Sequence, residues 1–219
     1  MMTNPIIVAA TVKQTSSLIF LHGLGDTGHG WSSTIAELKP AHCKLICPTA
    51  SSMPVTLNAG FTMPSWFDLR SLDASGPEDE DGIKSASHLV HDMIEGEIKA
   101  GISSDRIMIG GFSQGGALAL YSALSYPKPI GGVICLSGWL PLSKYFPNAM
   151  KCSDVLPVLQ CHGDCDPIVP LKWGQMTASV LKTLLKSPEF KSYRGLLHSS
   201  SEEELQDVKE FIGKQLPPV

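Results

Sequence analysis

Residues 106–121, which read RIMIGGFSQGGALALY, constrain the fold of this chain more than any other stretch. The stretch opens with a short apolar run that has the length and composition of a buried strand. It closes with residues 117–121, ALALY, which are good helix formers. Between them, residues 111–115 read GFSQG, so G-x-S-x-G spans a tight turn from a strand to a helix. This is the sequence context of a nucleophile elbow, which exposes a serine above the edge of a sheet.

An ordinary glycine-rich turn is the alternative interpretation, because a bare G-x-S-x-G also occurs by chance. In an elbow, Gly111 and Gly115 would let the strand and the helix pack closely, since neither carries a Cβ. The amide of Gln114 would lie at a helix N-terminus, where free N–H groups favour negative charge. Ser113 needs a base and an orienting acid to act as a nucleophile, so the elbow predicts a histidine and a carboxylate elsewhere in the chain.

Apolar runs typical of strands alternate with helical segments along the 219 residues. Strands are predicted at 17–21, 44–47, 107–109, 132–137, 157–161 and 190–193. Helices are predicted at 31–38, 82–100, 117–121, 171–185 and 202–216. This alternation predicts an α/β fold with a mostly parallel central sheet and helices on both faces. Because no internal repeat or linker is visible, residues 1–219 are expected to form a single domain.

The helix predicted at 82–100 has an apolar stripe on one side, formed by Leu89, Met93, Ile94 and Ile98. The acidic residues 78–81, EDED, precede it and suit the first turn of a helix. Metal or partner binding by this acidic run is the alternative.

Composition excludes several classes of protein. The net charge is −4, charged residues make up only 17% of the chain, and no basic stripe is present, so a nucleic-acid partner is not expected. No basic segment followed by a long apolar stretch opens the sequence, and no apolar run reaches the roughly 18 residues of a spanning helix. The expectation is a soluble cytoplasmic protein. Its cysteines are expected to be reduced thiols; they are Cys43, Cys47, Cys135, Cys152, Cys161 and Cys165.

Residues 22–30, HGLGDTGHG, contain the pattern G-x-G-x-x-G directly after the strand predicted at 17–21. That pattern is the fingerprint of a dinucleotide site, which also needs an acidic residue about 20 positions further on to bind the ribose. The next predicted strand, 44–47, is followed by Pro-Thr-Ala and not by an acid. No cofactor is therefore predicted.

An oxyanion loop is the favoured interpretation of residues 22–30. A strand that runs into His-Gly and further glycines can turn a backbone N–H towards the nucleophile. The two donors would then be the amides of Leu24 and Gln114. His22 lies at the strand end and is expected to be a packed loop residue and not a base.

The segment 50–77 shows no regular periodicity although it is rich in large apolar residues. Long irregular segments in compact domains are usually functional, which suggests an apolar cover over the site. The alternative is that these side chains only anchor a surface loop, and this is favoured for Trp66 and Phe67.

Partners for Ser113 are expected where other strands end, because catalytic groups in such sheets gather at the carboxyl ends of the strands. Asp164 and Asp166 both follow the strand 157–161, and Asp166 is favoured because prolines fix the loop after it. His198 follows the last strand. His162 precedes Asp166 by only four residues, too few to place it between the acid and the serine. The order Ser113, Asp166, His198 is that of an α/β-hydrolase.

A metal site formed by His162, Asp164, Cys165 and Asp166 is the remaining alternative for this loop. No second cluster supplies further ligands, so no metal is predicted.

Several longer stretches resemble one family closely. They are FLHGLGDTGHGW, PVTLN, MPSWFDL, GGFSQGGALALY, LPL, LQCHGDCDPIVP, the LHSS around His198 and the final LPPV, and they extend from residue 19 to the end. Together they resemble the cytosolic acyl-protein thioesterases, or lysophospholipase-like carboxylesterases. The resemblance implies Ser113, His198 and Asp166 as the catalytic residues, and the Leu24 and Gln114 amides as the oxyanion hole. It also implies an acyl groove lined by Leu69, Leu72, Trp139 and Ile168.

The implied substrates are S-acylated (palmitoylated) proteins and lysophospholipids. The implied oligomeric state is a monomer or weak homodimer.

Three positions depart from the family pattern. Met1-Met2-Thr3 lacks the Met-Cys that can be lipidated, so membrane contact is expected to be transient at most. Arg70 replaces an apolar residue near the groove, which leaves the preferred chain length open, and Gly138 replaces a cysteine.

The sequence therefore predicts a serine hydrolase that cleaves long-chain acyl thioesters and related esters through an acyl-enzyme. A general carboxylesterase for small soluble esters would share the triad but lack a long groove. A non-catalytic binder that kept the fold is a further alternative, which reaction of Ser113 with a fluorophosphonate would exclude.

Overall fold

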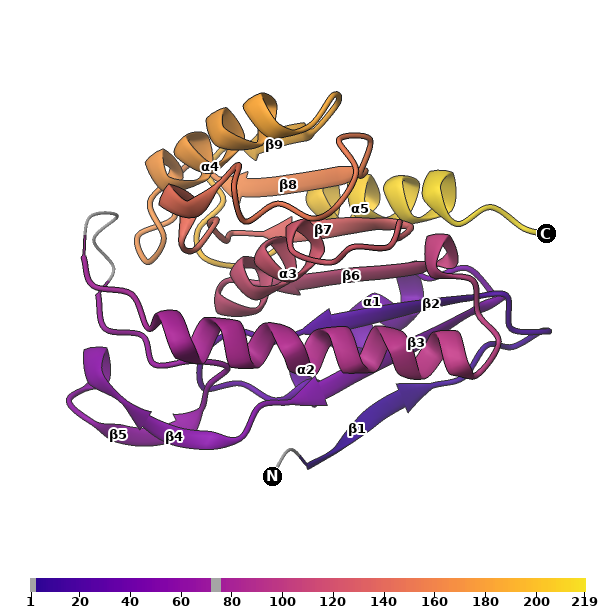
Figure 1. Cartoon of the computed structure of the whole chain (residues 1–219), viewed down its shortest axis with the longest axis horizontal. Helices are drawn as coiled ribbons and strands as arrows, with labels where there is room; N and C mark the ends of the chain where they lie inside the picture. The colour runs from indigo at the N-terminus through magenta and orange to yellow at the C-terminus, as the bar shows by residue number, and fades with distance from the viewer. Residues whose placement is uncertain (1–2, 72–75) are drawn as a thin grey trace.

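A twisted seven-stranded sheet forms the centre of the computed structural model, which describes residues 3–71 and 76–219 (Figure 1). The strand order is β1-β3-β2-β6-β7-β8-β9. The strands are β1 (Thr3–Val8), β2 (Ser16–Leu21), β3 (Cys43–Thr49), β6 (Ile107–Phe112), β7 (Gly132–Leu136), β8 (Val158–Gly163) and β9 (Glu189–Tyr193). Only β1 runs antiparallel to its neighbour, and the other pairs are parallel. The predicted mostly parallel sheet is confirmed, whereas the N-terminal edge strand β1 was not predicted.

Helices cover both faces of the sheet, as predicted. They are α1 (Gly28–Leu38), α2 (Glu80–Lys99), α3 (Gln114–Leu124), α4 (Leu171–Leu184) and α5 (Glu202–Gln215). One apolar cluster joins α2, α3 and α4 to one face, and a second joins α1 and α5 to the other. Within the part of the chain that the structure describes, no helix has the length and apolar composition that crossing a membrane requires.

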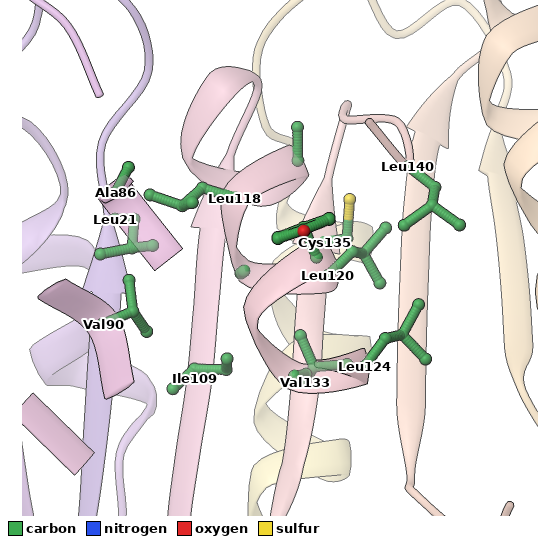
Figure 2. Close-up of a cluster of buried hydrophobic side chains, with 14 of the residues drawn as sticks. Leu21, Ala86, Val90, Ile109, Leu118, Leu120, Leu124, Val133, Cys135 and Leu140 are labelled. Atoms are coloured by element: carbon green, nitrogen blue, oxygen red, sulfur yellow. The ribbon is translucent and has the colours of Figure 1, made fainter. Parts of the chain in front are cut away.

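Helix α3 lies in the middle of the first cluster, and every one of its residues is buried. Figure 2 shows Leu118, Leu120 and Leu124 among side chains from the neighbouring strands and from α2. A helix that is apolar on all sides is stable only inside a core. The helix that begins directly after Ser113 is thus fixed on every side.

The predicted apolar stripe of α2 is confirmed in part, since Ile94 is buried and Met93 and Ile98 pack against the core, whereas Leu89 does not. The buried side of the helix includes Ile83, Ala86, Val90 and Ile94, whereas Leu89 is 39% exposed. The buried side is thus rotated from the predicted stripe towards Ile83, Ala86 and Val90.

The segment 50–77 contains a hairpin where no regular element was predicted. Strands β4 (Ser52–Val55) and β5 (Phe61–Pro64) pair antiparallel and project beside the main sheet (Figure 1). Each strand has four residues and contains a proline, which normally argues against a strand interior. After the hairpin, Trp66 and Phe67 are buried, as expected of residues that anchor a loop, but Phe67 also lines a cavity.

Candidate active site

Ser113 occupies a strained turn between β6 and α3. Its φ of 54° and ψ of −120° lie in a region that non-glycine residues rarely adopt. The amide of Ser113 donates to the carbonyl of Leu136 at 2.8 Å, and its carbonyl accepts from the amide of Ala117 at 2.9 Å. The main chain on both sides therefore holds the serine in this conformation.

The two glycines of the motif lie where no side chain fits. A Cβ on Gly115 would lie 2.2 Å from the carbonyl oxygen of Leu21, and one on Gly111 would lie 2.4 Å from the carbonyl carbon of Gly115. Real Cβ atoms essentially never approach so closely. The close packing of strand and helix expected from the sequence is present.

Ser113, His198 and Asp166 form one chain of hydrogen bonds. The Nε2 atom of His198 lies 3.0 Å from the Oγ of Ser113, and its Nδ1 lies 2.7 Å from Oδ2 of Asp166. The other oxygen of Asp166 accepts from the amides of Ile168 and Val169, each at 2.9 Å. The acid is thus oriented by the main chain and in turn orients the imidazole. This is the geometry of a serine nucleophile with its base.

Hydrogen bonds join the loop that carries Asp166 to the loop that carries His198. The amide of Gly195 donates to Oδ1 of Asp164 at 2.6 Å, and the amide of Cys165 donates to the carbonyl of Leu196 at 3.1 Å. Asp164 therefore binds a main-chain amide of the loop that carries the base and is not the acid that orients His198. These contacts fix the distance between the acid and the base.

Two other histidines near these loops have structural contacts. His162 is buried, and its Nε2 lies 2.7 Å from the carbonyl oxygen of Val169, so it does not reach Ser113. His22 accepts from the amide of Ala50 at 3.0 Å and packs on the ring of Trp66, as expected of a packed loop residue. Burial lowers the pKa of both imidazoles.

An aromatic row that the sequence analysis missed supports His198. The ring of Phe112 lies 4.7 Å from the imidazole of His198, centroid to centroid, and 5.0 Å from the ring of Trp31. The signal was present in the sequence, because Phe112 is the residue directly before the serine of the elbow. Such packing restricts the tilt of the imidazole.

The loop predicted to carry an oxyanion donor lies beside the nucleophile. A Cβ on Gly23 would lie 3.5 Å from the Cβ of Ser113, so the following residue, Leu24, is next to the site. The amide of Gln114 is the first of α3 and has no partner within the helix. The loop is therefore close to Ser113, and the role of the Leu24 and Gln114 amides as oxyanion donors stays a prediction.

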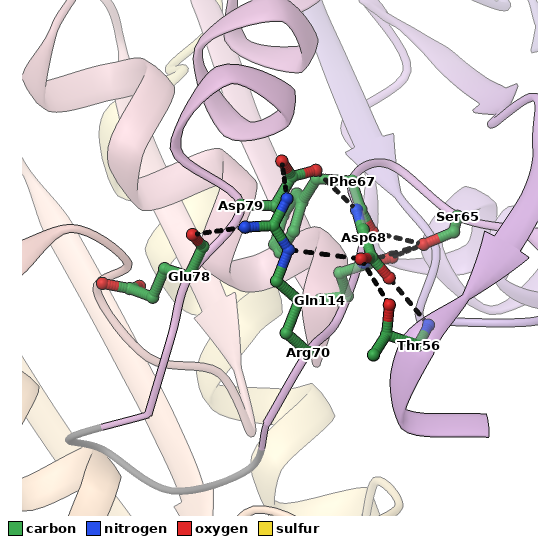
Figure 3. Close-up of polar contacts among 8 residues, drawn as sticks. All are labelled: Thr56, Ser65, Phe67, Asp68, Arg70, Glu78, Asp79 and Gln114. Atoms are coloured by element: carbon green, nitrogen blue, oxygen red, sulfur yellow. Dashed lines mark hydrogen bonds and ion pairs between the residues drawn. The ribbon is translucent and has the colours of Figure 1, made fainter. Parts of the chain in front are cut away.

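The side chain of Gln114 has a second function that the sequence did not reveal. It is fully buried, and its Nε2 donates to the carbonyl of Phe67 at 2.8 Å while its Oε1 accepts from the amide of Trp66 at 3.1 Å. A further bond of 3.0 Å connects Nε2 to the Oγ of Ser65 (Figure 3). The residue after the nucleophile thus fixes the segment that follows the hairpin.

That segment forms one wall of a cavity that is partly open to solvent. Residues 67–71 and 76–79 line one side; Trp139, Leu140, Trp173, Met176 and Val180 are among those that line the rest. The cavity adjoins the elbow on two sides. Phe67 is bonded to Gln114, and a Cβ on Gly138, the residue before Trp139, would lie 3.1 Å from the carbonyl oxygen of Ser113.

The structure places only two of the four residues predicted to line an acyl groove in the wall of this cavity. Leu69 and Trp139 line the cavity, and both are buried. Leu72 falls outside the described residues. Ile168 is 47% exposed and is not among the described lining residues, so its contact with an acyl chain stays a prediction.

Among residues 3–71 and 76–219, no group of three or more His, Cys, Asp or Glu side chains could hold a metal ion. All six cysteines lie in this part of the chain and are free thiols.

A strained serine at a strand-to-helix turn, joined through a histidine to a carboxylate at the ends of parallel strands, defines the serine hydrolases of the α/β-hydrolase fold. The chain belongs to the Phospholipase/Carboxylesterase family, whose sequence profile matches residues 2–216. The resemblance seen in the sequence is thereby confirmed.

Relatives within that family share the whole length of the chain. A protein of Gibberella zeae named acyl-protein thioesterase 1 is 42% identical over 98% of this chain and 96% of its own. The protein of the same name from Neurospora crassa is 40% identical over 98% and 93%. Among solved structures, Zea mays acyl-protein thioesterase 2 superposes with a TM-score of 0.89 at 32% identity, covering 97% of this chain and 99% of that one. Arabidopsis thaliana SOBER1 gives 0.87 at 36%, covering 92% and 99%.

Proposed function

We propose that this chain is an acyl-protein thioesterase, a serine hydrolase that cleaves long-chain acyl thioesters such as S-palmitoyl-cysteine in proteins, and related lysophospholipid esters. The observation that carries the proposal is the hydrogen-bonded chain of Ser113, His198 and Asp166 beside a cavity that Leu69 and Trp139 help to line. The names of the relatives support the thioester as substrate.

The proposed reaction has two steps. His198 accepts the proton of Ser113 as its oxygen attacks the thioester carbonyl, while Asp166 binds the opposite side of the imidazole and stabilises its positive charge. The amides of Leu24 and Gln114 stabilise the oxyanion, and each such donor contributes about 3 kcal/mol. The thiolate leaves, protonated by His198 where needed. Water, activated by the same histidine, then attacks the acyl-enzyme and releases the fatty acid.

Binding of the acyl chain is the more demanding part of this function. Each methylene is worth about 0.8 kcal/mol on burial, so a chain of about a dozen methylenes loses roughly 10 kcal/mol on leaving a bilayer unless the protein buries it again. The cavity beside the elbow supplies apolar surface for this burial through Leu69 and Trp139. Leu69 and Trp139 are proposed as its apolar contacts, together with Leu72 and Ile168.

The further expectations follow the same proposal. Residues 1–219 would form one catalytic domain that needs no metal or organic cofactor and binds no nucleic acid. The protein would act in the cytoplasm as a monomer or weak homodimer, with transient membrane contact at most.

A general carboxylesterase for small esters is the second candidate. It is favoured by one observation: the cavity wall includes the charged side chains of Asp68, Arg70 and Asp79. Charged groups at the wall reduce the gain from burying a long alkyl chain.

Hydrolysis of a series of acyl thioesters from acetyl to hexadecanoyl separates the two candidates. The wild type is measured beside Ser113→Ala and a control, Ser179→Ala, which removes an exposed hydroxyl bonded only to its own helix. A kcat/KM that rises with chain length and is lost only in Ser113→Ala is expected. Activity confined to short chains would favour the small-ester enzyme, and activity that survives in Ser113→Ala would place the active site elsewhere.

A further inference from the structure

Arg70 connects the two parts of the cavity wall that come from opposite ends of one segment. We call residues 65–71 the first arm and residues 76–79 the second arm. Both arms line the cavity, and the side chain of Gln114 fixes the first arm at its start, through Ser65, Trp66 and Phe67. No comparable contact with the elbow is found for the second arm among the hydrogen bonds of the described residues. The second arm leads into α2, and Oε1 of Glu78 accepts from the amide of Leu142 at 2.9 Å, so its link to the first arm must come from other contacts.

The guanidinium of Arg70 supplies contacts with both arms. Its Nε lies 3.3 Å from Oδ2 of Asp68 in the first arm. Its Nη1 donates to the carbonyl of Glu78 at 3.3 Å, and its Nη2 donates to Oδ1 of Asp79 at 2.9 Å, both in the second arm (Figure 3). A planar guanidinium can form these bonds at once, which a lysine ammonium matches only in part.

Each of the two carboxylates also binds a further segment. Oδ2 of Asp79 accepts from the amide of Asp68 at 2.9 Å. Asp68 accepts from the amide of Thr56 at 2.8 Å and from its hydroxyl at 2.7 Å. Thr56 lies in the loop that joins β4 to β5. Asp79 occupies the N-cap position of α2, yet its side chain caps no helical amide. The carboxylate instead joins the start of α2 to the first arm.

Burial makes this arrangement sensitive to loss of the arginine. The side chains of Asp68 and Asp79 are only 16% and 13% exposed, whereas that of Arg70 is 42% exposed. Burial opposes ionisation of Asp68, but the hydrogen bonds from Thr56 and the charge of Arg70 hold its pKa below the ordinary value. Without Arg70, two mostly buried carboxylates would repel each other across the arms. Because both carboxylates already bind Arg70, its charge is not free to receive an anionic group of a substrate.

We propose that Arg70 is a positioning residue for the acyl cavity: its bonds to Asp68, Glu78 and Asp79 hold the two arms together and thereby set the preference for acyl-chain length. The proposal rests on the proposed function and adds a determinant of specificity that acts on binding of the chain and not on the chemistry at Ser113. A looser wall would make fewer contacts with a long chain, while a short acyl group has little need of the wall.

The test compares acetyl and dodecanoyl thioesters in the wild type, Arg70→Ala and Arg70→Lys. Lys128→Ala is the control, because it removes a cation of similar exposure that forms an ion pair with Glu95 outside the cavity lining. Loss of one partner of a partly buried charge pair is expected to raise KM for the dodecanoyl substrate by roughly tenfold in Arg70→Ala, with a much smaller change for acetyl. Arg70→Lys should restore part of the loss, and Lys128→Ala should match the wild type.

A second variant keeps the test informative if Arg70→Ala folds poorly. Asp79→Asn retains an oxygen that can accept from the amide of Asp68 but loses the ion pair with Arg70. It should shift the chain-length profile in the same direction, and the double variant Arg70→Ala/Asp79→Asn should lose less than the sum of the two single variants.

Different results would overturn the two proposals. If the wild type hydrolyses long chains through Ser113 but the folded Arg70 and Asp79 variants keep its profile, the role of Arg70 is wrong and the proposed function stands. The role is also wrong if the loss is confined to substrates with an anionic group, since Arg70 would then bind the ligand. If the wild type shows no hydrolysis of long chains that depends on Ser113, the proposed function fails first, and the role of Arg70 fails with it.

Discussion

The elbow at Ser113 and the cavity wall formed by residues 65–71 and 76–79 adjoin each other but are held by different kinds of contact. Main-chain hydrogen bonds and glycines too crowded for a side chain fix the elbow. Side chains fix the wall, above all the buried Gln114 and the ion pairs of the partly exposed Arg70. A turn built by the main chain tolerates little change, whereas a wall built by side-chain pairs can vary without loss of the fold. The catalytic chemistry and the choice of substrate can therefore change independently.

Asp166→Asn should produce the largest effect and should act on the elbow alone. An amide in place of the carboxylate no longer fixes the imidazole in the required tautomer, so kcat should fall by roughly 10³–10⁴-fold. The loss should be equal for short and long acyl thioesters, because the cavity is untouched. Steady-state kinetics on both substrates measures it. A loss that falls mainly on long chains would show that the two regions are not independent.

Gly115→Ala should give the next largest effect, this time on stability. The new methyl group would lie 2.2 Å from the carbonyl oxygen of Leu21, and relief of that contact requires the strand and helix to separate. We expect a loss of about 3 kcal/mol or more in the free energy of unfolding, measured by urea denaturation. Gly213→Ala is the control, since nothing lies within 4 Å of a Cβ there, and it should stabilise α5 by about 0.5–1 kcal/mol. Equal stability of Gly115→Ala and wild type would contradict the account of the elbow.

Glu204→Gln should have a smaller effect, a change in the free energy of unfolding that depends on pH. Its site is the helix that follows the catalytic histidine. Glu204 is fully buried in the first turn of α5, the helix that starts just after His198. Burial, reinforced by the charge of Asp207, raises its pKa from 4.5 to about 8. Between these values the folded protein keeps the proton and the unfolded chain releases it, so stability falls as pH rises.

The glutamine variant lacks this titration. Its stability relative to the wild type should increase by about 2 kcal/mol between about pH 5 and about pH 7, and the gain should level off above about pH 8. Denaturation curves of both proteins across this range provide the measurement. A stability difference that does not change with pH would show that Glu204 titrates normally.

The elbow and its partners could be predicted from the sequence because their signals are local. G-x-S-x-G follows an apolar strand, and Asp166 and His198 each follow a strand in a parallel sheet, whose carboxyl ends meet at one edge. The structure brings these three side chains into hydrogen-bonding distance. The two glycines of the turn were equally informative, because the strand and the helix approach each other too closely for a residue with a side chain.

The cavity wall could not be predicted in the same way because its contacts join residues far apart in sequence. Gln114 binds Phe67 across 47 positions, and no local pattern marks either residue as the other's partner. Asp79 lies in an acidic run that indicated only a helix start, yet its carboxylate binds Arg70. The short hairpin β4–β5 contains prolines and lacked any strand signal.

Labelling of Ser113 by alkyl fluorophosphonates tests the central claim most directly, because one reaction reports on both regions. The serine is phosphonylated only if the triad activates it, and the rate depends on how the cavity binds the alkyl chain. We predict that peptide mapping finds the label on Ser113 and that a dodecyl reagent reacts faster than an ethyl reagent. No label on Ser113, or equal rates for both reagents, would contradict the account of an activated serine beside a cavity that binds acyl chains.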